Sequence, residues 1–498
     1  MDKKKAAWIV VVALIVVVGI TLLTKQFIPS IEAGQKEEKQ EQQGETITND
    51  GTNQQPEEKK DEQQSQENKN EKMVYISASK LNVRAEAKKD AGIVDSLIKG
   101  TGVEVVEELT DEAGEVWFKV TYDSPGEPIT GWIASAYTVK DRTELLSESL
   151  RKLDFSPQNK TYEYPNNPRV EVKGIYLTLY SASNNRLDQL IEMAKRTEIN
   201  AFVIDVKDDN GHMLFPTKAA EKYSPDANKK APVKDIEALM KKLKENNIYA
   251  IARIVSFKDP TYTKQHPDRA IIYRSNGKPF TNSDGLIWAS AYDRDLWQYN
   301  IEVAKEAAQV GFNEIQFDYV RFPASNGGKL DKQLDYRNVN NESKPETIQN
   351  YLKLAHKELS PLQVYIGADI YGLVGSVADD MALGQYWEAV SNVVDYVNPM
   401  MYPSHYANGT YGLSVPDAYP YETVYHSTKD SVARNKNIET PATIRPWIQD
   451  FTAPWVKGHI KYGPKQLEDQ IRALKENGVN EYMLWNAGNK YSEEALKK

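Results

Sequence analysis

The sequence predicts an α/β protein whose largest part is a (β/α)8 TIM barrel, preceded by a small all-β domain and an N-terminal transmembrane helix. Three observations lead to this prediction. From about residue 170, strand-like apolar runs alternate eight times with amphipathic helical runs. Between residues 73 and 140, short alternating runs are separated by Gly, Asp and Pro. Residues 6–23 form one continuous run of apolar or small side chains.

The N-terminal region, residues 1–33, is predicted to be a membrane anchor. At about 1.5 Å of rise per helical residue, the run 6–23 nearly spans a hydrocarbon core of roughly 30 Å. Lys3, Lys4 and Lys5 precede it and favour the cytoplasmic side, so we expect a single-pass protein of the cell membrane with the bulk of the chain extracellular. A cleaved signal peptide is the alternative, although its apolar region usually has only about 7–15 residues.

Two segments are expected to connect the folded parts. Residues 34–72 are mostly Glu, Lys, Gln and Asn, and a segment with so little apolar surface is predicted to be a disordered linker. Residues 141–169 are expected to connect the small β domain to the barrel, which is predicted to span residues 170–498.

The composition excludes several kinds of function. The net charge is −9 and no basic run follows the first residues, which argues against a nucleic-acid partner. The chain has no cysteine, so disulfides, thiol catalysis and cysteine-ligated metals are excluded. Its 6 histidines show no zinc-binding spacing. We therefore expect no cofactor.

Residues 73–140 are predicted to form a small β-barrel from four short alternating runs: Met73–Ile76, Val103–Glu107, Val116–Val120 and Gly131–Ala134. The motif KLNVR at 80–84, followed by Gly100, Trp117 and GWI at 131–133, resembles the bacterial SH3 domain. The resemblance implies that this domain binds cell-wall peptide. Packing in the core of the domain would explain Trp117 and Trp132 equally well.

Eight strands are expected in the barrel, with helical apolar periodicity between them. The strands are predicted at residues 172–179, 200–207, 248–255, 312–319, 363–370, 394–401, 442–449 and 479–486. Helical stretches include residues 186–197, 233–246, 295–310 and 464–477. A doubly wound open sheet is the main alternative, but no glycine-rich phosphate-binding motif supports a nucleotide-binding version of it.

The fourth strand and the loop after it, EIQFDYVRFP at 314–323, are the most informative stretch of the chain. The strand is apolar on one face, whereas the other face holds Glu314, Gln316 and Asp318. A strand covered by helices should be apolar on both faces. A carboxylate at the carboxyl end of a barrel strand is typical of a catalytic residue, which would explain the polar face.

Two aspartates at strand ends are predicted to be catalytic, because the active site of such barrels lies there. Asp318 ends the fourth strand and is the predicted nucleophile or stabiliser of an oxocarbenium-like state. A structural pairing with Arg321 or Arg253 is the alternative. Asp369 ends the fifth strand on the side facing the mouth and is the predicted acid/base. A capping role for the next helix is the alternative there.

Other polar and aromatic side chains at the strand ends are predicted to bind substrate: Asp205, Asp208, Arg253, Arg321, Tyr402, Trp447 and Trp485. Asp205 and Asp208 have opposite parity, so at most one should face the barrel axis unless the strand has already ended. For the aromatic residues, packing is a competing explanation. No metal is required, although the aspartate-rich loop at 205–209 would suit a hard cation.

This combination of groups suits a carbohydrate substrate. Glycoside hydrolysis commonly uses two carboxyl groups, and flat aromatic faces stack on sugar rings. A separation of about 5–5.5 Å between the carboxyl groups of Asp318 and Asp369 would predict retention of configuration, and one of about 6.5–9.5 Å would predict inversion.

Eight motifs along the barrel together resemble a bacterial family named "putative glycoside hydrolase domain", which often follows a membrane anchor and an SH3-like module. The motifs are GIYLT (174–178), FVIDVKDDNG (202–211), IARIVSFKD (251–259), IQFDYVRFP (315–323), GADIYG (367–372), VNPMMYPSHY (397–406), IRPWIQDF (444–451) and LWNAG (484–488). The resemblance implies a glycosidase acting on cell-wall or extracellular polysaccharide, peptidoglycan included. One departure concerns α-amylase-like barrels, which have an arginine two residues before the catalytic aspartate; Gln316 holds that place here.

Two other functions stay open from the sequence. The barrel could bind carbohydrate without catalysis, because the acid/base partner is less clearly marked than Asp318. The chain could also be a wall-associated scaffold that acts through its SH3-like domain.

Overall fold

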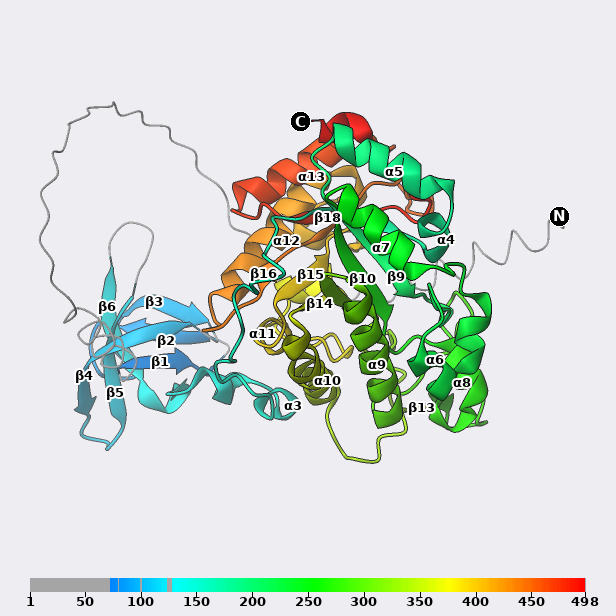
Figure 1. Cartoon of the computed structure of the whole chain (residues 1–498). Coiled ribbons are helices and arrows are strands. Elements are labelled where there is room, and N and C mark those ends of the chain that lie inside the picture. Colours follow the sequence, from blue (N-terminus) through cyan, green and yellow to red (C-terminus); the bar gives the residue numbers. More distant parts are fainter. Residues whose placement is uncertain (1–71, 79, 99–100, 123–127, 498) are drawn as a thin grey trace, which may run out of the picture. The chain divides into compact units, whose positions relative to one another are not determined.

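The computed structural model describes residues 72–78, 80–98, 101–122 and 128–497 (Figure 1). Within these ranges the chain forms two compact units that divide between Lys152 and Leu153. The predicted transmembrane helix (1–33) and nearly all of the predicted linker (34–72) lie outside the described residues. Within the described ranges, no helix is long and apolar enough to cross a membrane.

The first unit is an antiparallel sheet of seven strands. In sheet order they are β3 (Ile93–Ile98), β2 (Lys80–Arg84), β6 (Ile129–Ala134), β5 (Val116–Tyr122), β4 (Gly102–Thr110), β1 (Met73–Ile76) and β7 (Thr138–Val139). Alternate side chains form its core, among them Val74, Val83, Val103 and Ile133. Trp117 is also buried, and its Nε1 donates to Asp111 Oδ2 over 3.1 Å. The all-β prediction for this segment is confirmed.

The second unit is a closed barrel of parallel strands, as predicted. Its strands are β8 (Lys173–Leu177), β9 (Ala201–Lys207), β10 (Tyr249–Val255), β12 (Glu314–Asp318), β14 (Tyr365–Tyr371), β15 (Tyr396–Met400), β16 (Thr443–Ile444) with β17 (Trp447–Gln449), and β18 (Tyr482–Trp485). Pairing of β18 with β8 and of β14 with β15 completes the ring, which excludes the open-sheet alternative. Each predicted strand region corresponds to one barrel strand, with β14 extending one residue beyond its region, except the seventh, which contains two short strands.

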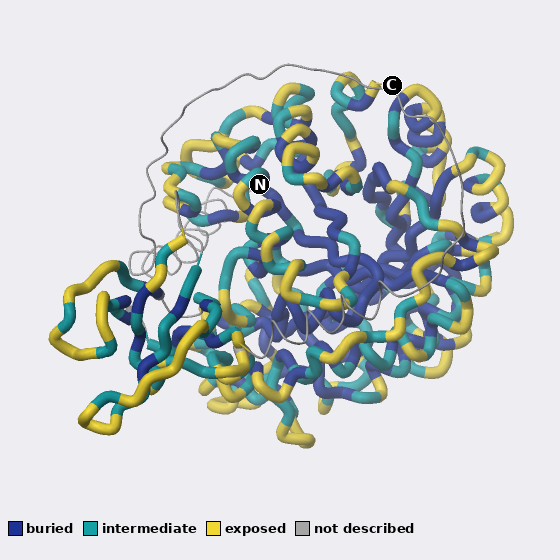
Figure 2. The backbone as a smooth tube through the Cα atoms, turned by 90° about the vertical axis from the view of Figure 1, so that its left-hand side faces the viewer, coloured by how far each residue is buried: buried dark blue, intermediate teal, exposed yellow. Residues whose placement is uncertain are grey.

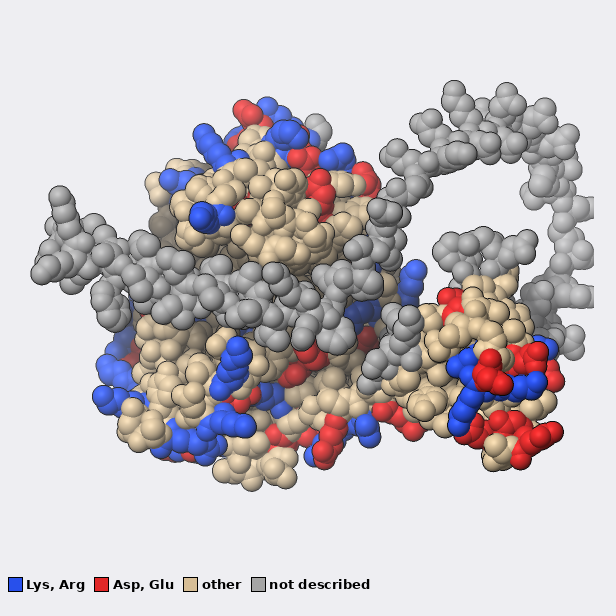
Figure 3. All heavy atoms as spheres, turned by 180° about the vertical axis from the view of Figure 1, so that it is seen from behind, with Lys and Arg blue, Asp and Glu red and all other residues tan. Residues whose placement is uncertain are grey.

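Helices surround the barrel and bury their apolar sides against it (Figures 1 and 2). They are α4 (Leu179–Ala182), α5 (Asn185–Arg196), α6 (Lys218–Tyr223), α7 (Ile236–Glu245), α8 (Pro260–Gln265), α9 (Arg294–Val310), α10 (Lys344–Leu359), α11 (Trp387–Ser391), α12 (Pro420–Asn435) and α13 (Pro464–Glu476). In α5 the buried residues Leu187, Leu190, Ile191 and Ala194 follow helical spacing. Acidic and basic side chains both occur on the barrel face seen in Figure 3.

The helix ends follow from local sequence. Asp293 caps α9 by accepting a hydrogen bond from the Asp295 amide, and the helix ends at Gly311, whose φ of 110° suits glycine. Ser343 and Glu346 form a capping box at the start of α10. These caps fix where α9 and α10 begin and where α9 ends.

The polar face of β12 points into the barrel. At its base, Arg445 Nη1 donates to both Glu314 oxygens over 2.9 and 2.8 Å, although β12 and the Arg445 segment are not neighbours in the sheet. The same guanidinium donates through Nε to Glu481 and lies 3.5 Å from the Tyr396 ring centroid. Part of the polar face predicted to serve catalysis is therefore a buried ion pair that fills the barrel.

The segment 153–169 packs against the amino-terminal end of the barrel. Lys160 Nζ donates to the backbone carbonyls of Ser391, Val394 and Thr440 over 2.7–2.9 Å. Because these carbonyls precede the strands β15 and β16, the segment belongs to the barrel unit as a floor, and that unit begins at Leu153.

Candidate active site

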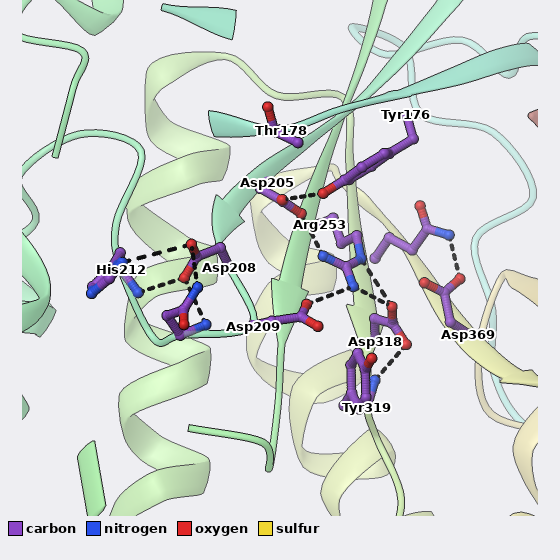
Figure 4. A network of polar contacts seen from close by, with 12 residues as sticks. Tyr176, Thr178, Asp205, Asp208, Asp209, His212, Arg253, Asp318, Tyr319 and Asp369 are labelled. Atoms are coloured by element: carbon purple, nitrogen blue, oxygen red, sulfur yellow. Dashed lines mark hydrogen bonds and ion pairs between the residues drawn. The ribbon is translucent and has the colours of Figure 1, made fainter. Parts of the chain in front are cut away.

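Four successive strands bring charged side chains to the carboxyl-end mouth of the barrel (Figure 4). Asp205 on β9 pairs in register with Arg253 on β10, and Val255 on β10 pairs with Asp318 on β12. Asp369 follows the pair Phe317–Ala368 on β12 and β14. In-register neighbours in a parallel sheet point to the same side, so these side chains converge inside the mouth.

Arg253 lies at the centre of this cluster and is only 1% exposed. Its Nε and Nη2 donate to Asp318 Oδ2 over 2.9 and 2.6 Å. Its Nη1 donates to Asp205, and its Nη2 also donates to Asp209 over 3.2 Å. One buried guanidinium thus holds three carboxylates in place, with the charge-assisted geometry that arginine provides.

Asp318 is the carboxylate that Arg253 holds most closely. Besides the two guanidinium hydrogen bonds to Oδ2, its Oδ1 accepts one from the Tyr319 amide over 2.5 Å. Tyr319 has a φ of 48°, a left-handed conformation that is uncommon for a bulky residue and is often found at functional sites. Arg253 supplies, from the neighbouring strand, the guanidinium that Gln316 cannot supply from β12 itself.

Asp369 lies in a different environment, 1% exposed and without a direct cationic partner among the described residues. Its Oδ1 accepts hydrogen bonds from Gln316 Nε2 and, over 2.8 Å, from Trp447 Nε1, while its Oδ2 has no hydrogen-bond partner there. Burial, together with the nearby charge of Asp318, raises the pKa of Asp369 well above its ordinary value. These contacts replace the helix-capping alternative.

Asp205 and Asp209 complete the acidic side of the mouth. Burial raises the pKa of Asp205 to about 7, although Arg253 and the Tyr176 hydroxyl, which donates to it over 2.6 Å, act in the opposite direction. Burial alone would also raise the pKa of Asp209, but Arg253 and Lys258 outweigh it, and this pKa is lowered. The mouth thus holds carboxyl groups with different proton affinities.

Aromatic rings lie beside the carboxylates of the mouth. Trp485 stacks on Tyr176 at 4.1 Å between ring centroids and meets Trp447 edge-on at 5.6 Å. Tyr402 lies 6.4 Å from Trp485. Burial, together with the charges of Asp369 and Asp318, raises the pKa of the Tyr402 hydroxyl far above its usual range.

Two of the predicted site residues are not brought into this cluster. Asp208 turns aside, and its Oδ1 accepts the amides of Asn210 and His212 over 2.9 and 2.8 Å, so it shapes the loop after β9 (Figure 4). Asp205 and Asp208 have opposite parity along the chain. Because Asp205 points toward the barrel axis, Asp208 points away from it. Arg321 donates to the Phe322 carbonyl instead of to Asp318.

The Arg321 guanidinium lies close to three aromatic rings. Its guanidinium carbon lies 4.8 Å from the Trp288 ring centroid, 5.1 Å from that of Tyr319 and 4.7 Å from that of Tyr371. Of the two arginines considered as partners for Asp318, only Arg253 makes that contact.

Three residues of the cluster were not among the predicted site residues: Tyr176, Asp209 and Lys258. Lys258 Nζ donates to Asp209 Oδ2 over 3.0 Å and so links the loop after β10 to the loop after β9. Tyr176 stands at an inward position of β8, and strand parity is the signal that could have identified it. Within the described ranges, no group of three or more His, Cys, Asp or Glu side chains has the arrangement of a metal site.

The family model described as "Putative glycosyl hydrolase domain" matches residues 174–491. The chain belongs to this family. A second model, the bacterial SH3 domain, matches residues 79–139 of this glycosyl hydrolase family member. No curated protein matches the chain.

Solved structures similar to this family member include three bacterial proteins. A hypothetical protein from Ruminiclostridium thermocellum is 35% identical, with 39% of this chain and 96% of that chain covered and a TM-score of 0.35. The PgaB (BpsB) glycoside hydrolase domain from Bordetella bronchiseptica is 15% identical, with 64% of this chain and 95% of that chain covered and a TM-score of 0.46. The spore cortex-lytic enzyme SleL from Bacillus megaterium is 12% identical, with 66% of this chain and 74% of that chain covered and a TM-score of 0.38.

Proposed function

We propose that the protein is a glycoside hydrolase that acts on cell-wall or extracellular polysaccharide, with Asp318 and Asp369 as its carboxylate pair. The main support for this proposal is that two carboxyl groups on adjacent strands have different environments. Asp318 accepts two guanidinium hydrogen bonds, as ionised carboxylates do, whereas burial raises the pKa of Asp369. Divergent environments of this kind separate the acid from the anionic partner in glycosidases.

In the proposed mechanism, Asp369 donates a proton to the oxygen of the glycosidic bond as that bond breaks. Asp318 either attacks the anomeric carbon, forming a glycosyl ester that water then hydrolyses, or stabilises the oxocarbenium-like centre while water attacks it. Arg253 fixes the orientation of Asp318, and Trp485 offers a ring face to the sugar beside it. Retention and inversion both fit this arrangement, and NMR of the first-formed product distinguishes them.

The other parts of the chain suggest where the reaction takes place. The bacterial SH3 domain would bind cell-wall peptide, and the apolar run at residues 6–23 would anchor the chain in the cell membrane with the barrel outside. Polysaccharide or peptidoglycan would then be the partner of the barrel.

The decisive experiment measures sugar release from purified wall polysaccharide by the wild-type protein and by Asp318→Asn. We expect the variant to lose activity by at least about 10²-fold, since one of the two reacting carboxyls is gone. Asp208→Asn is the matched control, because Asp208 follows β9 next to the cluster residue Asp209 but turns away from the mouth. Equal release by wild type and Asp318→Asn would remove Asp318 from the mechanism.

A non-catalytic carbohydrate-binding barrel is the second candidate, and one observation favours it. Both oxygens of Asp318 are already engaged, and Asp369 is almost fully buried. Binding of wall glycan without turnover of any tested polymer, by a protein whose Asp318→Asn variant binds equally well, would support this candidate over the hydrolase.

A further inference from the structure

A continuous series of aromatic rings leads from the candidate active site to the surface. It begins with Tyr176, whose hydroxyl donates to Asp205, and passes to Trp485 at 4.1 Å and to Tyr402 at 6.4 Å. Phe451 follows at 6.1 Å from Tyr402, and Trp455 at 6.1 Å from Phe451. We call these five residues the aromatic track.

Exposure increases along the aromatic track. Tyr176 and Tyr402 are buried, Trp485 and Phe451 are half-buried, and Trp455 is 62% exposed. A single exposed tryptophan is common on protein surfaces and carries little meaning alone. Trp455 differs because an unbroken series of ring contacts joins it to the carboxylate cluster.

Phe451 and Trp455 are held by a fixed loop. Gln449, at the end of β17, donates through Nε2 to the Phe451 carbonyl and to Asp417 Oδ1, each over 3.0 Å. Farther along the loop, the Tyr462 hydroxyl donates to the Asp417 carbonyl over 3.0 Å. Because Asp417 is buried, both ends of the loop are tied to one interior residue. The loop therefore holds the two rings in a fixed arrangement, with their planes inclined by 21°.

We propose that the aromatic track is an extended glycan-binding site, with Phe451 and Trp455 binding sugar residues outside the reacting centre. The ring centroids of Phe451 and Trp455, the two outer rings, are 6.1 Å apart, about the size of one sugar ring, and aromatic faces suit the apolar faces of pyranoses. The substrate is then a polysaccharide chain several sugars long, and a disaccharide cannot reach Trp455. This inference rests on the proposed function for its class of ligand.

The test compares wild type with Trp455→Ala in the full chain, using peptide-free glycan strands from purified cell wall and a size series of their fragments. Peptide-free strands exclude a contribution from peptide binding by the SH3 domain. We expect the KM or Kd for long strands to rise about tenfold in Trp455→Ala, with kcat and the values for disaccharides unchanged. Trp455→Tyr should keep most of the affinity. Tyr162→Ala is the matched control, since Tyr162 is an exposed ring in the barrel floor, away from the mouth.

The outcomes separate this inference from the proposed function. Equal values for wild type and Trp455→Ala on long strands, with Asp318→Asn inactive, would overturn the aromatic track and leave the hydrolase standing. Strand binding that weakens in Trp455→Ala, without sugar release by wild type, would support the track and overturn the hydrolase. Neither binding nor release by wild type would overturn both.

Discussion

Arg253 provides the charge that balances the acidic side of the mouth. Replacing it by Met keeps much of the side-chain volume but leaves Asp205 and Asp318 buried without their shared partner. We expect Arg253→Met to lower the free energy of unfolding by about 3–5 kcal/mol, measured by urea denaturation.

A triple variant tests whether the loss of charge balance explains the effect of Arg253→Met. Adding Asp205→Asn and Asp318→Asn to Arg253→Met removes the buried carboxylate charges that have lost their cationic partner. The triple variant should therefore regain part of the lost stability. A triple variant less stable than Arg253→Met would show that packing, and not charge balance, is the main contribution of Arg253.

Asp369 is expected to lower stability while serving activity. Because the folded-state pKa of Asp369 is raised, the folded protein holds this proton more tightly than the unfolded chain does. The stabilisation that comes from the bound proton is complete below about pH 4, and it declines as the pH rises through the folded pKa. Asp369→Asn does not titrate, and its unfolding free energy relative to wild type should increase with pH above about 4. Its sugar release should fall.

Urea denaturation of both proteins at several pH values tests this expectation. A stability difference between them that is independent of pH would contradict the raised pKa of Asp369. Asp208→Asn, which removes an aspartate of the same region outside the cluster, serves as the reference for unspecific effects.

At the residue scale, strand parity predicted which carboxyls face the mouth but not which groups they contact. Asp318 and Asp369 end adjacent strands on the same side, and alternation alone indicates this. Two arginines were available to Asp318, and the choice of Arg253 depends on the register between β10 and β12. Register is a property of two strands together, so it could not be predicted from either strand's sequence alone.

At the scale of a single strand, Gly367 lets β14 approach the polar centre of the barrel. A Cβ at this position would lie 2.8 Å from Asn398 Nδ2 and 3.1 Å from Glu314 Oε1. Both groups are buried, and Glu314 is fixed by Arg445. We expect Gly367→Ala to lower the unfolding free energy by about 1–3 kcal/mol.

Gly174 on β8 offers a matched comparison in urea denaturation. A Cβ there would lie 3.0 Å from Cγ of Met483, a flexible side chain that can shift more readily than Glu314 or Asn398. The smaller loss is expected for Gly174→Ala. An equal or larger loss there would contradict the view that the fixed polar groups near Gly367 set the cost.

The seventh strand shows why element boundaries were harder to predict than elements. The run 442–449 has the composition of one strand, but the structure divides it into β16 and β17. Pro446 lies between them and has no amide hydrogen to donate to the sheet. Its carbonyl still accepts from the Met483 amide over 2.8 Å, so the barrel stays closed across the break.

At the scale of the whole molecule, the division near residue 153 predicts that the barrel folds independently. A chain beginning at Leu153 retains every described contact of the barrel's floor and mouth. We expect its urea midpoint for barrel unfolding, and its release of soluble oligosaccharides, to match those of the full chain. Its retention on intact cell wall should fall, because the SH3 domain is missing. A large loss of barrel stability would show that the barrel depends on the preceding residues.

The floor formed by residues 153–169 also limits how molecules travel through the protein. Lys160 ties this segment across the amino-terminal end of the barrel, and the Glu314–Arg445 pair fills the interior above it. A glycan therefore has no passage along the barrel axis. Both halves of a cleaved chain would have to leave by the opening through which the next chain enters, so competition between departing and arriving glycans would make the proposed enzyme subject to inhibition by its own products.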